Sequence, residues 1–489
     1  MLISEHNIED HNLRFKLLAK KLETTLKYFS TDIYIMCNTN LQISRLHPEY
    51  LGIWKPFILQ PTLTRIDKLK LILNFTRVIA YYYVSIFIKF IDSEKTIINF
   101  DLFAKNLDYL FVSHLVKKDE DDNDFYFGDI LSVLSATKKT VHRLLIPHED
   151  ISLNSYKSVS FKTTILSKKM TKVTLLKYVV LNTISVYNLF IYCTSKKFTI
   201  YETISIIVGQ LSNMSIFCIA AQIRGTLMAL RPKKLVFTYE GNAIERLIFS
   251  LCSEFGVHSI GYQHAPIIKG QYAVYRTLGD GLDPDTILCS GPHYANQFIK
   301  KLPNKTSIKI IGSPKYFEFS QDFFIKKQGR HILLTPDGNK GSILKFIDLG
   351  LELNDSKKFD KITIRSHPLY QKYLSNELKK CAQEIENKIN ISTNPLDYDL
   401  RKCSWVIYQN SSTCIQALLA GCQVIYYSYN PVNVDPLWEL TSSSKTAHTL
   451  SEVLQITENY PRASLESVME LHAKGKLLFS KLNYDILLM

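Results

Sequence analysis

Two residues able to do acid–base chemistry follow two consecutive predicted strands. Glu240 comes after the apolar run at 235–237, and His264 comes after the run at 257–262. Between them, apolar residues recur at helical spacing over 244–251. Ligands of open parallel sheets bind outside the carboxyl ends of the strands. We therefore expect Glu240 and His264 to face one crevice, where a carboxylate can act as a general base or nucleophile.

Both residues also have a structural interpretation. Glu240 could be a carboxylate favoured by the positive end of the following helix, and His264 could be a hydrogen-bonded structural histidine. Gly241, directly after Glu240, is expected to let a substrate approach the backbone. The residues expected to contact the substrate beside the two candidates are Tyr239, Asn242 and Gln263.

Three segments of the C-terminal half carry residue types that bind anions. The segments are 335–342 (TPDGNKGS), 365–368 (RSHP) and 410–413 (NSST), each at the end of a predicted strand. Glycines permit close backbone approach, and free N–H groups at a helix N-terminus bind phosphate. An ordinary tight turn, a packing or capping histidine and helix-capping hydroxyls are the structural alternatives. The candidate anion-binding residues are Gly338, Asn339, Lys340, Arg365, His367, Ser411, Ser412 and Thr413.

The elements that must position these residues form two series of short apolar runs alternating with amphipathic helices. This alternation is typical of βαβ units and parallel sheets, so we predict an α/β fold with two doubly wound, Rossmann-like domains facing a cleft. The expected division is an N-terminal domain, 1–320, and a C-terminal nucleotide-binding domain, 321–489. The first would combine a helix-rich part, 1–230, with a Rossmann-like core, 233–315. Strands are expected at 234–238, 257–262, 286–290 and 307–311, then at 331–335, 361–365, 389–392, 404–408 and 422–427.

The first 230 residues contain several apolar stretches. The stretch 69–91 is interrupted by Asn74, Arg77 and Lys89, which disfavours a simple membrane span; a buried helix is favoured over an interfacial one. The stretches 178–195 and 203–223 are long enough to span, but polar groups inside them are costly in lipid without partners. Buried helices are therefore favoured there as well. A first strand is expected at 32–36, an exposed charged loop at 117–125, and a basic surface linker or a patch for anionic lipid at 156–172.

The overall charge favours anionic partners. The 489 residues carry 59 Lys and Arg against 45 Asp and Glu, a formal net charge of +14. Nucleic acid is the least favoured of these partners, because no Arg-rich tract or zinc-finger spacing occurs. Nine cysteines without a C-x-x-C pair predict free thiols in a reducing compartment, and the N-terminus does not resemble a secretory signal.

Residues 233–440 resemble bacterial GT-B glycosyltransferases of surface polysaccharide biosynthesis. The motifs that carry the resemblance are Gly312-Ser313-Pro314, the glycine-containing loop 337–341, His367-Pro368 and Ser411-Ser412. The last two pairs are similar to those of transferases that use CMP-activated acidic sugars, namely the bacterial sialyltransferases and the Kdo transferases of capsule assembly. CDP-glycerol-dependent wall polymer transferases show a related pattern. The segment 239–266 resembles the N-domain block of a surface carbohydrate biosynthesis group.

The resemblance implies that His367, Ser411 and Ser412 hold the nucleotide phosphate. Gly312 and Ser313 belong to the same nucleotide-binding set, as does Gln416, which stands where many GT-B enzymes have a ribose-binding glutamate. Lys340 would help to stabilise the leaving phosphate. Glu240 would be the base, or the nucleophile in a retaining reaction. His264 would orient the donor carboxylate or serve as the base itself.

The expected activity is transfer of an acidic, CMP-activated sugar to a growing surface glycan or lipid-linked glycan. Alternatives are a CDP-glycerol or UDP-sugar transferase, and a non-catalytic glycan- or lipid-binding scaffold. The resemblance implies no cofactor and no catalytic metal, since a diagnostic Asp-x-Asp metal motif is not evident. It also implies a cytoplasmic protein, peripheral on the inner membrane.

Overall fold

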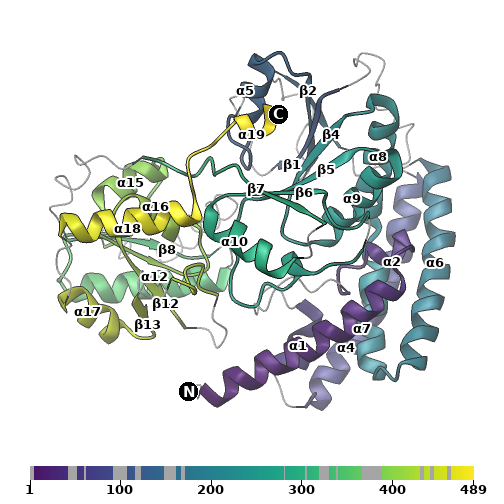
Figure 1. Cartoon of the computed structure of the whole chain (residues 1–489). Coiled ribbons are helices and arrows are strands. Elements are labelled where there is room, and N and C mark those ends of the chain that lie inside the picture. Colours follow the sequence, from purple (N-terminus) through teal and green to yellow (C-terminus); the bar gives the residue numbers. More distant parts are fainter. Residues whose placement is uncertain are drawn as a thin grey trace.

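The chain folds into two lobes, each built on a parallel β-sheet with helices on its faces (Figure 1). The computed structural model describes residues 5–41, 52–59, 62–91, 107–115, 123–147, 161–166, 171–279, 281–302, 305–318, 330–337, 340–365, 388–429, 434–440, 445–459 and 464–488. Every strand pairing in both sheets is parallel. The predicted GT-B-like class, two doubly wound domains, is confirmed.

The first sheet has seven strands in the order β3-β2-β1-β4-β5-β6-β7. Because β4 lies between β1 and β5, the carboxyl ends of these three strands meet at one edge of the sheet. The elements of this lobe are β1 (Tyr109–Leu115), α5 (Ile130–Ala136), β2 (Val141–Pro147), β3 (Lys162–Ile165), α8 (Met214–Leu230), β4 (Lys234–Thr238), α9 (Ala243–Phe255), β5 (His258–Gln263), η3 (Ala273–Tyr275), β6 (Thr286–Cys289), α10 (Pro292–Lys301) and β7 (Ser307–Ile310).

Two expectations for the N-terminal part are wrong. Three strands, β1 to β3, precede residue 233, so the sheet does not begin where the predicted core does. The expected strand at 32–36 is helical, because the Asp32 carboxylate accepts the N–H groups of Tyr34 (2.9 Å) and Ile35 (3.1 Å) and so caps a short helix. The remaining N-terminal helices are α1 (Glu5–Tyr28), α2 (Ile33–Met36), η1 (Gly52–Trp54), α3 (Lys55–Leu59), α4 (Arg65–Ile91), α6 (Lys172–Ser195) and α7 (Ile200–Leu211).

The second sheet has six strands in the order β10-β9-β8-β11-β12-β13. The predicted strands of this series match β8 to β12 within one or two residues, and β13 was not predicted. The elements are β8 (His331–Thr335), α12 (Lys340–Asp355), β9 (Lys361–Ile364), β10 (Asn390–Ile391), α15 (Leu396–Lys402), β11 (Trp405–Tyr408), α16 (Thr413–Leu419), β12 (Gln423–Tyr427), β13 (Lys445–Ala447) and α17 (Leu450–Asn459). The expected division between 320 and 321 stays a prediction.

The end of the chain returns from the second lobe to the first. Helix α18 (Leu465–Leu478) packs against both α16 and α10, and the chain then runs to α19 (Asp485–Leu488) beside β1 (Figure 1). Gly312, in the left-handed conformation (φ +93°), faces the Lys481 carbonyl so closely that a Cβ would collide with it. The N–H of Ser313 donates to the Ser480 carbonyl (2.9 Å). This crossing segment holds the two lobes together.

A buried ion pair joins the first two strands to the loop that follows β1. Arg143 on β2 and Asp124 have fully buried side chains, with Arg143 Nη1 3.2 Å from Asp124 Oδ2. Asp124 also accepts the hydroxyl of Ser113 (2.9 Å) and the N–H of Tyr126 (2.9 Å). Asp124 was expected in an exposed charged loop; it is buried because it organises the turn that carries Tyr126. Residues 116–122 of that loop lie outside the described chain.

We expect Asp124→Ala to destabilise the protein strongly, since it leaves the Arg143 guanidinium buried without its carboxylate. Breaking such a pair by removing one partner costs about 3–5 kcal/mol. Lys233→Ala is the control, because Lys233 pairs with Asp108 at the surface and is 68% exposed; exposed pairs contribute about 1 kcal/mol or less. Melting curves of the two variants test this. Equal, small losses in both would contradict the structural role of Asp124.

Candidate active site

The structure places Glu240 and His264 opposite each other at the carboxyl edge of the first sheet. Glu240 follows β4 and His264 follows β5, and the two strands are neighbours. Glu240 Oε1 lies 3.9 Å from His264 Nε2, with side chains 17% and 11% exposed. The carboxylate is therefore partly shielded from water, yet within reach of a ligand.

A second carboxylate, Glu245, performs the structural role considered for Glu240. Glu245 Oε2 accepts the N–H groups of Glu240 (2.9 Å), Gly241 (2.7 Å) and Asn242 (2.9 Å), so it caps the start of α9. Burial, together with the charge of Glu240, raises the pKa of Glu245 to about 8. The sequence carried a signal for this cap, the capping box formed by Asn242 and Glu245. The capping carboxylate is therefore Glu245, and the Glu240 carboxylate lies beside His264 and Asn242.

Gly241 has a packing role rather than a substrate-binding one, which corrects the sequence-based expectation. Its φ is +80°, and a Cβ at this position would collide with the backbone of Ala273 and Val274. The space beside the glycine is therefore filled by the η3 turn, and no substrate can approach there.

Two other residues expected to contact the substrate have partners within the protein. Tyr239 is buried, and its hydroxyl donates to the Val274 carbonyl (3.0 Å) while accepting from Arg246 Nη2 (2.9 Å). Gln263 is buried as well, and its Oε1 accepts the N–H (3.1 Å) and the hydroxyl (3.0 Å) of Ser290. Both side chains thus stabilise neighbouring loops, and substrate contacts at these two residues stay predictions. Asn242, the N-cap residue of α9, is half-buried beside Glu240.

An aromatic ring and an ammonium group complete the first-lobe side of the site. The Tyr126 ring lies perpendicular to the His264 ring, with centroids 4.7 Å apart. Burial and the charge of nearby Glu240 raise the pKa of the Tyr126 phenol. Lys315 follows β7, and burial lowers the pKa of its ammonium to about 8, against the opposing effect of Glu240. The sequence analysis singles out neither residue: Tyr126 lies in a loop without a motif, and Lys315 directly follows the Gly312-Ser313-Pro314 motif.

The second lobe contributes Ser412 to this group. Lys315 Nζ donates to Ser412 Oγ across the lobes (3.3 Å). Ser411 is used locally instead: its hydroxyl donates to Thr413 Oγ1 (3.0 Å) and accepts the Thr413 N–H (3.3 Å). Gln416 lies one turn further along α16 and is half-buried. We call Tyr126, Glu240, His264, Lys315 and Ser412 the cleft cluster.

Other predicted anion-binding residues lie apart from this cluster or are engaged elsewhere. Arg365 Nη1 is bound to Asp399 Oδ2 (3.0 Å) and to the Ser392 hydroxyl (3.3 Å), so it fastens β9 to the turn before α15. Gly312 and Ser313 pack against the crossing C-terminal segment. Lys340 is exposed at the start of α12. Nucleotide contacts at these four residues stay predictions, as do those at Gly338, Asn339 and His367, which lie outside the described residues.

The described chain offers no cluster of three or more His, Cys, Asp or Glu side chains suited to a metal ion. The segment Asp283-Pro284-Asp285 has Asp-x-Asp spacing, but its carboxylates are engaged. Asp283 pairs with the buried Arg246, and Asp285 Oδ2 accepts the N–H of Ser259 (2.7 Å). The absence of a catalytic metal stays a prediction.

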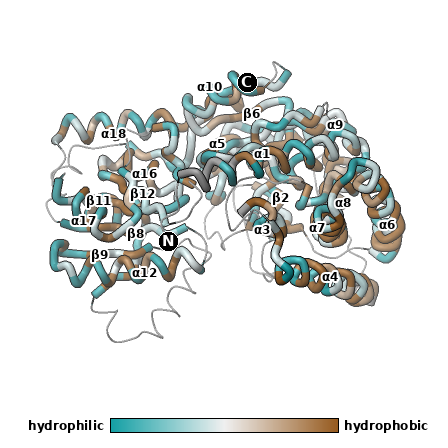
Figure 2. Tube along the Cα trace, turned by 90° about the horizontal axis from the view of Figure 1, so that it is seen from below, coloured by the Kyte–Doolittle hydropathy of each residue, from teal (hydrophilic) through white to brown (hydrophobic). Residues whose placement is uncertain are grey.

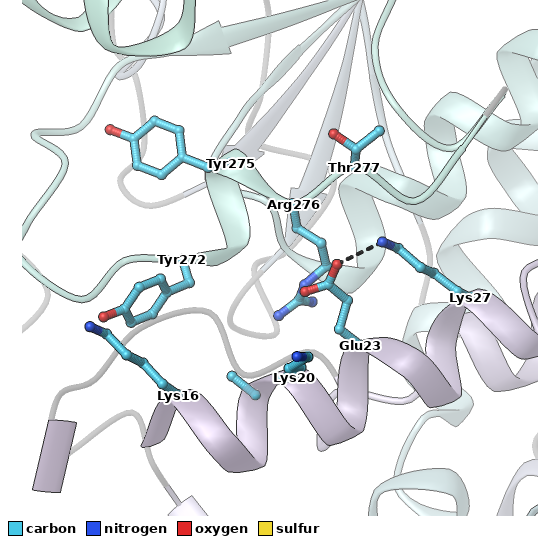
Figure 3. A pocket seen from close by; sticks show the side chains of 9 residues that line it. Lys16, Lys20, Glu23, Lys27, Tyr272, Tyr275, Arg276 and Thr277 are labelled. Carbon is cyan, nitrogen blue, oxygen red and sulfur yellow. Dashed lines mark ion pairs between the residues drawn. The ribbon is translucent and has the colours of Figure 1, made fainter. Parts of the chain in front are cut away.

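A separate cationic pocket lies between α1 and the η3 turn (Figure 3). Its volume is ≈380 Å³. Three lysines of α1 face a buried arginine across it, and Glu23 is paired with Lys27 (2.9 Å). A pocket with this excess of cations can hold an anionic group. It is lined by Lys16, Ala19, Lys20, Glu23, Lys27, Tyr272, Tyr275, Arg276 and Thr277.

We expect Lys315→Met to melt no lower than the wild type at pH 7, because the folded protein holds the ammonium in a site that disfavours its charge. The pKa of Lys315 in the folded protein, about 8, is below the ordinary lysine pKa of the unfolded chain. The charged ammonium therefore destabilises the folded protein fully below pH 8, and this destabilisation fades as the pH rises toward the pKa of the unfolded chain. The difference between variant and wild type should therefore shrink at pH 9.5. Lys309→Met, an exposed change on β7, is the control. Melting of Lys315→Met well below wild type at pH 7 would contradict this account.

No protein-family model matches the chain, and no curated protein matches it in sequence. Its structure is similar to MurG of Acinetobacter baumannii (9% identity, TM-score 0.44, covering 76% of this chain and 94% of that one). It is also similar to the glycosyltransferase SnogD from Streptomyces nogalater (11%, 0.46, 77% and 96%) and to UDP-GlcNAc 2-epimerase from Methanocaldococcus jannaschii (11%, 0.42, 73% and 94%). A glycosyltransferase and an epimerase are thus both among the similar structures, and at these values the likeness assigns no reaction.

Proposed function

We propose that the protein is a glycosyltransferase that moves a sugar from a nucleotide donor to a glycan acceptor in the cleft between the lobes. The observation that carries the proposal is the cleft cluster. It places a partly shielded carboxylate, Glu240, beside a lysine and a hydroxyl that meet from opposite lobes. A base on one side and phosphate-binding groups on the other are what transfer from a nucleotide sugar requires.

In the proposed reaction, an acceptor hydroxyl attacks the anomeric carbon of the donor sugar. Glu240 takes the hydroxyl proton as the new C–O bond forms. The bond between the anomeric carbon and the phosphate oxygen breaks, and the nucleotide leaves with the electron pair. His264, 3.9 Å from the carboxylate, positions Glu240 and becomes its charged partner whenever the imidazole is protonated.

The leaving phosphate gains negative charge in this step, so its surroundings decide the rate. The Lys315 ammonium and the Ser412 hydroxyl can both donate to a phosphate oxygen, and charge-assisted hydrogen bonds of this kind are the strong ones. Because Lys315 is half-buried, its charge is screened by water less than that of an exposed lysine. Burial disfavours the positive charge of the Lys315 ammonium. A phosphate placed between Lys315 and Ser412 would supply the negative charge that balances it.

The donor in this proposal is a CMP-linked acidic sugar, and the acceptor is a growing surface glycan. The net charge of +14 supports an anionic donor and acceptor, and the cationic pocket beside η3 supports an acceptor carried on a phosphorylated lipid. A CDP-glycerol or UDP-sugar donor is the alternative of the same class. The eight described cysteines, all buried free thiols, support a reducing, cytoplasmic location.

A nucleotide screen by thermal shift tests the donor class. We expect CMP or CDP to raise the melting temperature more than UDP or GDP, since a ligand bound only by the native state stabilises it. Ser412→Ala should weaken the affinity by roughly tenfold or more, the scale of a lost hydrogen bond to a charged group. Ser411→Ala is the matched control, because that hydroxyl is turned toward Thr413. If Ser412→Ala folds and keeps full CMP affinity, the phosphate assignment is wrong.

The base is tested by a pair of glutamate variants with the donor found in that screen. Glu240→Gln should melt normally and lose about a hundredfold or more in turnover, the scale of a missing general base. Glu245→Ala should show the opposite pattern: a lower melting temperature, because it removes the acceptor of three backbone N–H groups, and a smaller loss of turnover per folded molecule. Near-normal turnover in Glu240→Gln would move catalysis away from this carboxylate. Nucleotide binding without turnover in the wild type would favour a non-catalytic scaffold.

A further inference from the structure

Helices α4 and α6 turn apolar faces outward, contrary to the expectation that they are buried (Figure 2). On α6 the exposed residues recur every three or four positions, so they form one stripe along its outer side. The exposed large apolar residues of α4 are Ile66, Leu69, Ile72, Leu73, Tyr81, Tyr83, Val84, Phe87, Ile88 and Phe90; those of α6 are Val173, Leu176, Val180, Ile184, Tyr187, Phe190 and Ile191. So large a continuous apolar face is rare on a soluble monomer.

The inner side of α6 buries polar side chains, Asn182 and Ser185, among apolar and aromatic ones. Asn182 is fully buried, and its Oδ1 accepts from Gln210 Nε2 (2.7 Å). The Tyr178 hydroxyl donates to Asn213 Oδ1 (2.6 Å). The Ser185 hydroxyl donates to Asp32 Oδ2 (3.1 Å). These three polar groups, which would be costly in lipid, thus have partners inside the protein, whereas Asn188 is exposed.

The two helices run antiparallel, side by side. Lys172, at the start of α6, lies over the ring of Phe90 near the end of α4 (5.0 Å). Lys68, near the start of α4, lies over the ring of Tyr201 on α7, which follows α6 (5.5 Å). Helix α7 packs against both helices from the inner side. The outward stripes therefore form one surface backed by protein.

The charges on this surface are almost all positive. Helix α4 contains five Lys and Arg and one Asp, and α6 contains two Lys and no acidic residue. Most exposed cations lie near the helix ends, at Arg65, Lys70, Lys172 and Lys177, whereas Arg77 is exposed at the middle of α4. Lys196 and Lys197 follow the end of α6. Apolar centres with basic ends suit a leaflet of anionic lipid, whose headgroups attract lysine and arginine.

We propose that the outer faces of α4 and α6 form a lipid-binding surface that lies flat in one leaflet of an anionic bilayer. Both helices are long and apolar enough to cross a membrane. However, their inner sides are packed against α7 and α2, so lipid can reach only one side of the pair. Arg77 is exposed at the middle of α4, where a spanning helix would carry it into the bilayer centre. This inference is independent of the proposed sugar transfer.

The test is flotation of the purified full chain with vesicles of phosphatidylcholine and phosphatidylglycerol in equal amounts. The wild type should float with these vesicles, and less with phosphatidylcholine alone or in high salt. The double variant Val180→Glu, Ile184→Glu should reduce the bound fraction by about tenfold or more, since it charges the stripe. The matched control is Ile299→Glu, Leu344→Glu, which charges exposed apolar residues on α10 and α12 and should float like the wild type.

Three results would overturn the proposal. In the first, the wild type does not bind vesicles and is a dimer by light scattering, while the α6 variant is a monomer. This face would then bind a second copy of the chain. Another is equal flotation of the α6 variant and the wild type. The third is resistance of the cell-membrane-bound protein to alkaline carbonate, which would indicate insertion across the bilayer. Melting curves establish that each variant folds, and a Tyr187→Trp variant, whose fluorescence should shift to the blue on vesicles, gives an independent readout.

Discussion

The position of the second lobe depends on the return of the chain across Gly291 and Gly312. A Cβ at either glycine would collide with the backbone of the segment 477–481, so only glycine permits this close approach. Helix α18, just before the crossing, packs against α10 of the first lobe and α16 of the second. His472 on α18 also binds the Leu419 carbonyl at the end of α16 (2.7 Å). Because α16 starts beside Ser412, the crossing fixes where Ser412 meets Lys315.

Within the first lobe, two glutamates five residues apart have separate tasks. Glu245 is buried, and its carboxyl group accepts hydrogen bonds from three backbone N–H groups, which fixes the turn after β4. That turn directs Glu240 toward His264. A largely buried carboxylate held beside a histidine, a phenol and a lysine has the surroundings of a functional acid or base. Tyr239 and Gln263, which precede Glu240 and His264 in the chain, are buried and hydrogen-bonded within the protein.

The sequence predicts the two sheets from residue 233 onward because strands and helices alternate there in short, regular units. It does not predict β1 to β3, which are separated by longer segments and carry no local motif. At 32–36 the apolar pattern favours a strand, but the Asp32 cap makes a helix. The facing of Glu240 and His264 follows from parallel pairing of their strands. Lys315 and Ser412, 97 positions apart, meet only through tertiary structure. Likewise, apolar periodicity in α6 does not distinguish a buried face from one exposed to lipid.

A crystal structure of the protein with the nucleotide that stabilises it most tests the central claim directly. We expect a phosphate oxygen within hydrogen-bonding distance of both Lys315 Nζ and Ser412 Oγ, with the leaving oxygen on the side of Glu240. A nucleotide bound elsewhere, such as in the cationic pocket between α1 and η3, with the cleft cluster unchanged and its lysine and serine still bound to each other, would contradict the account.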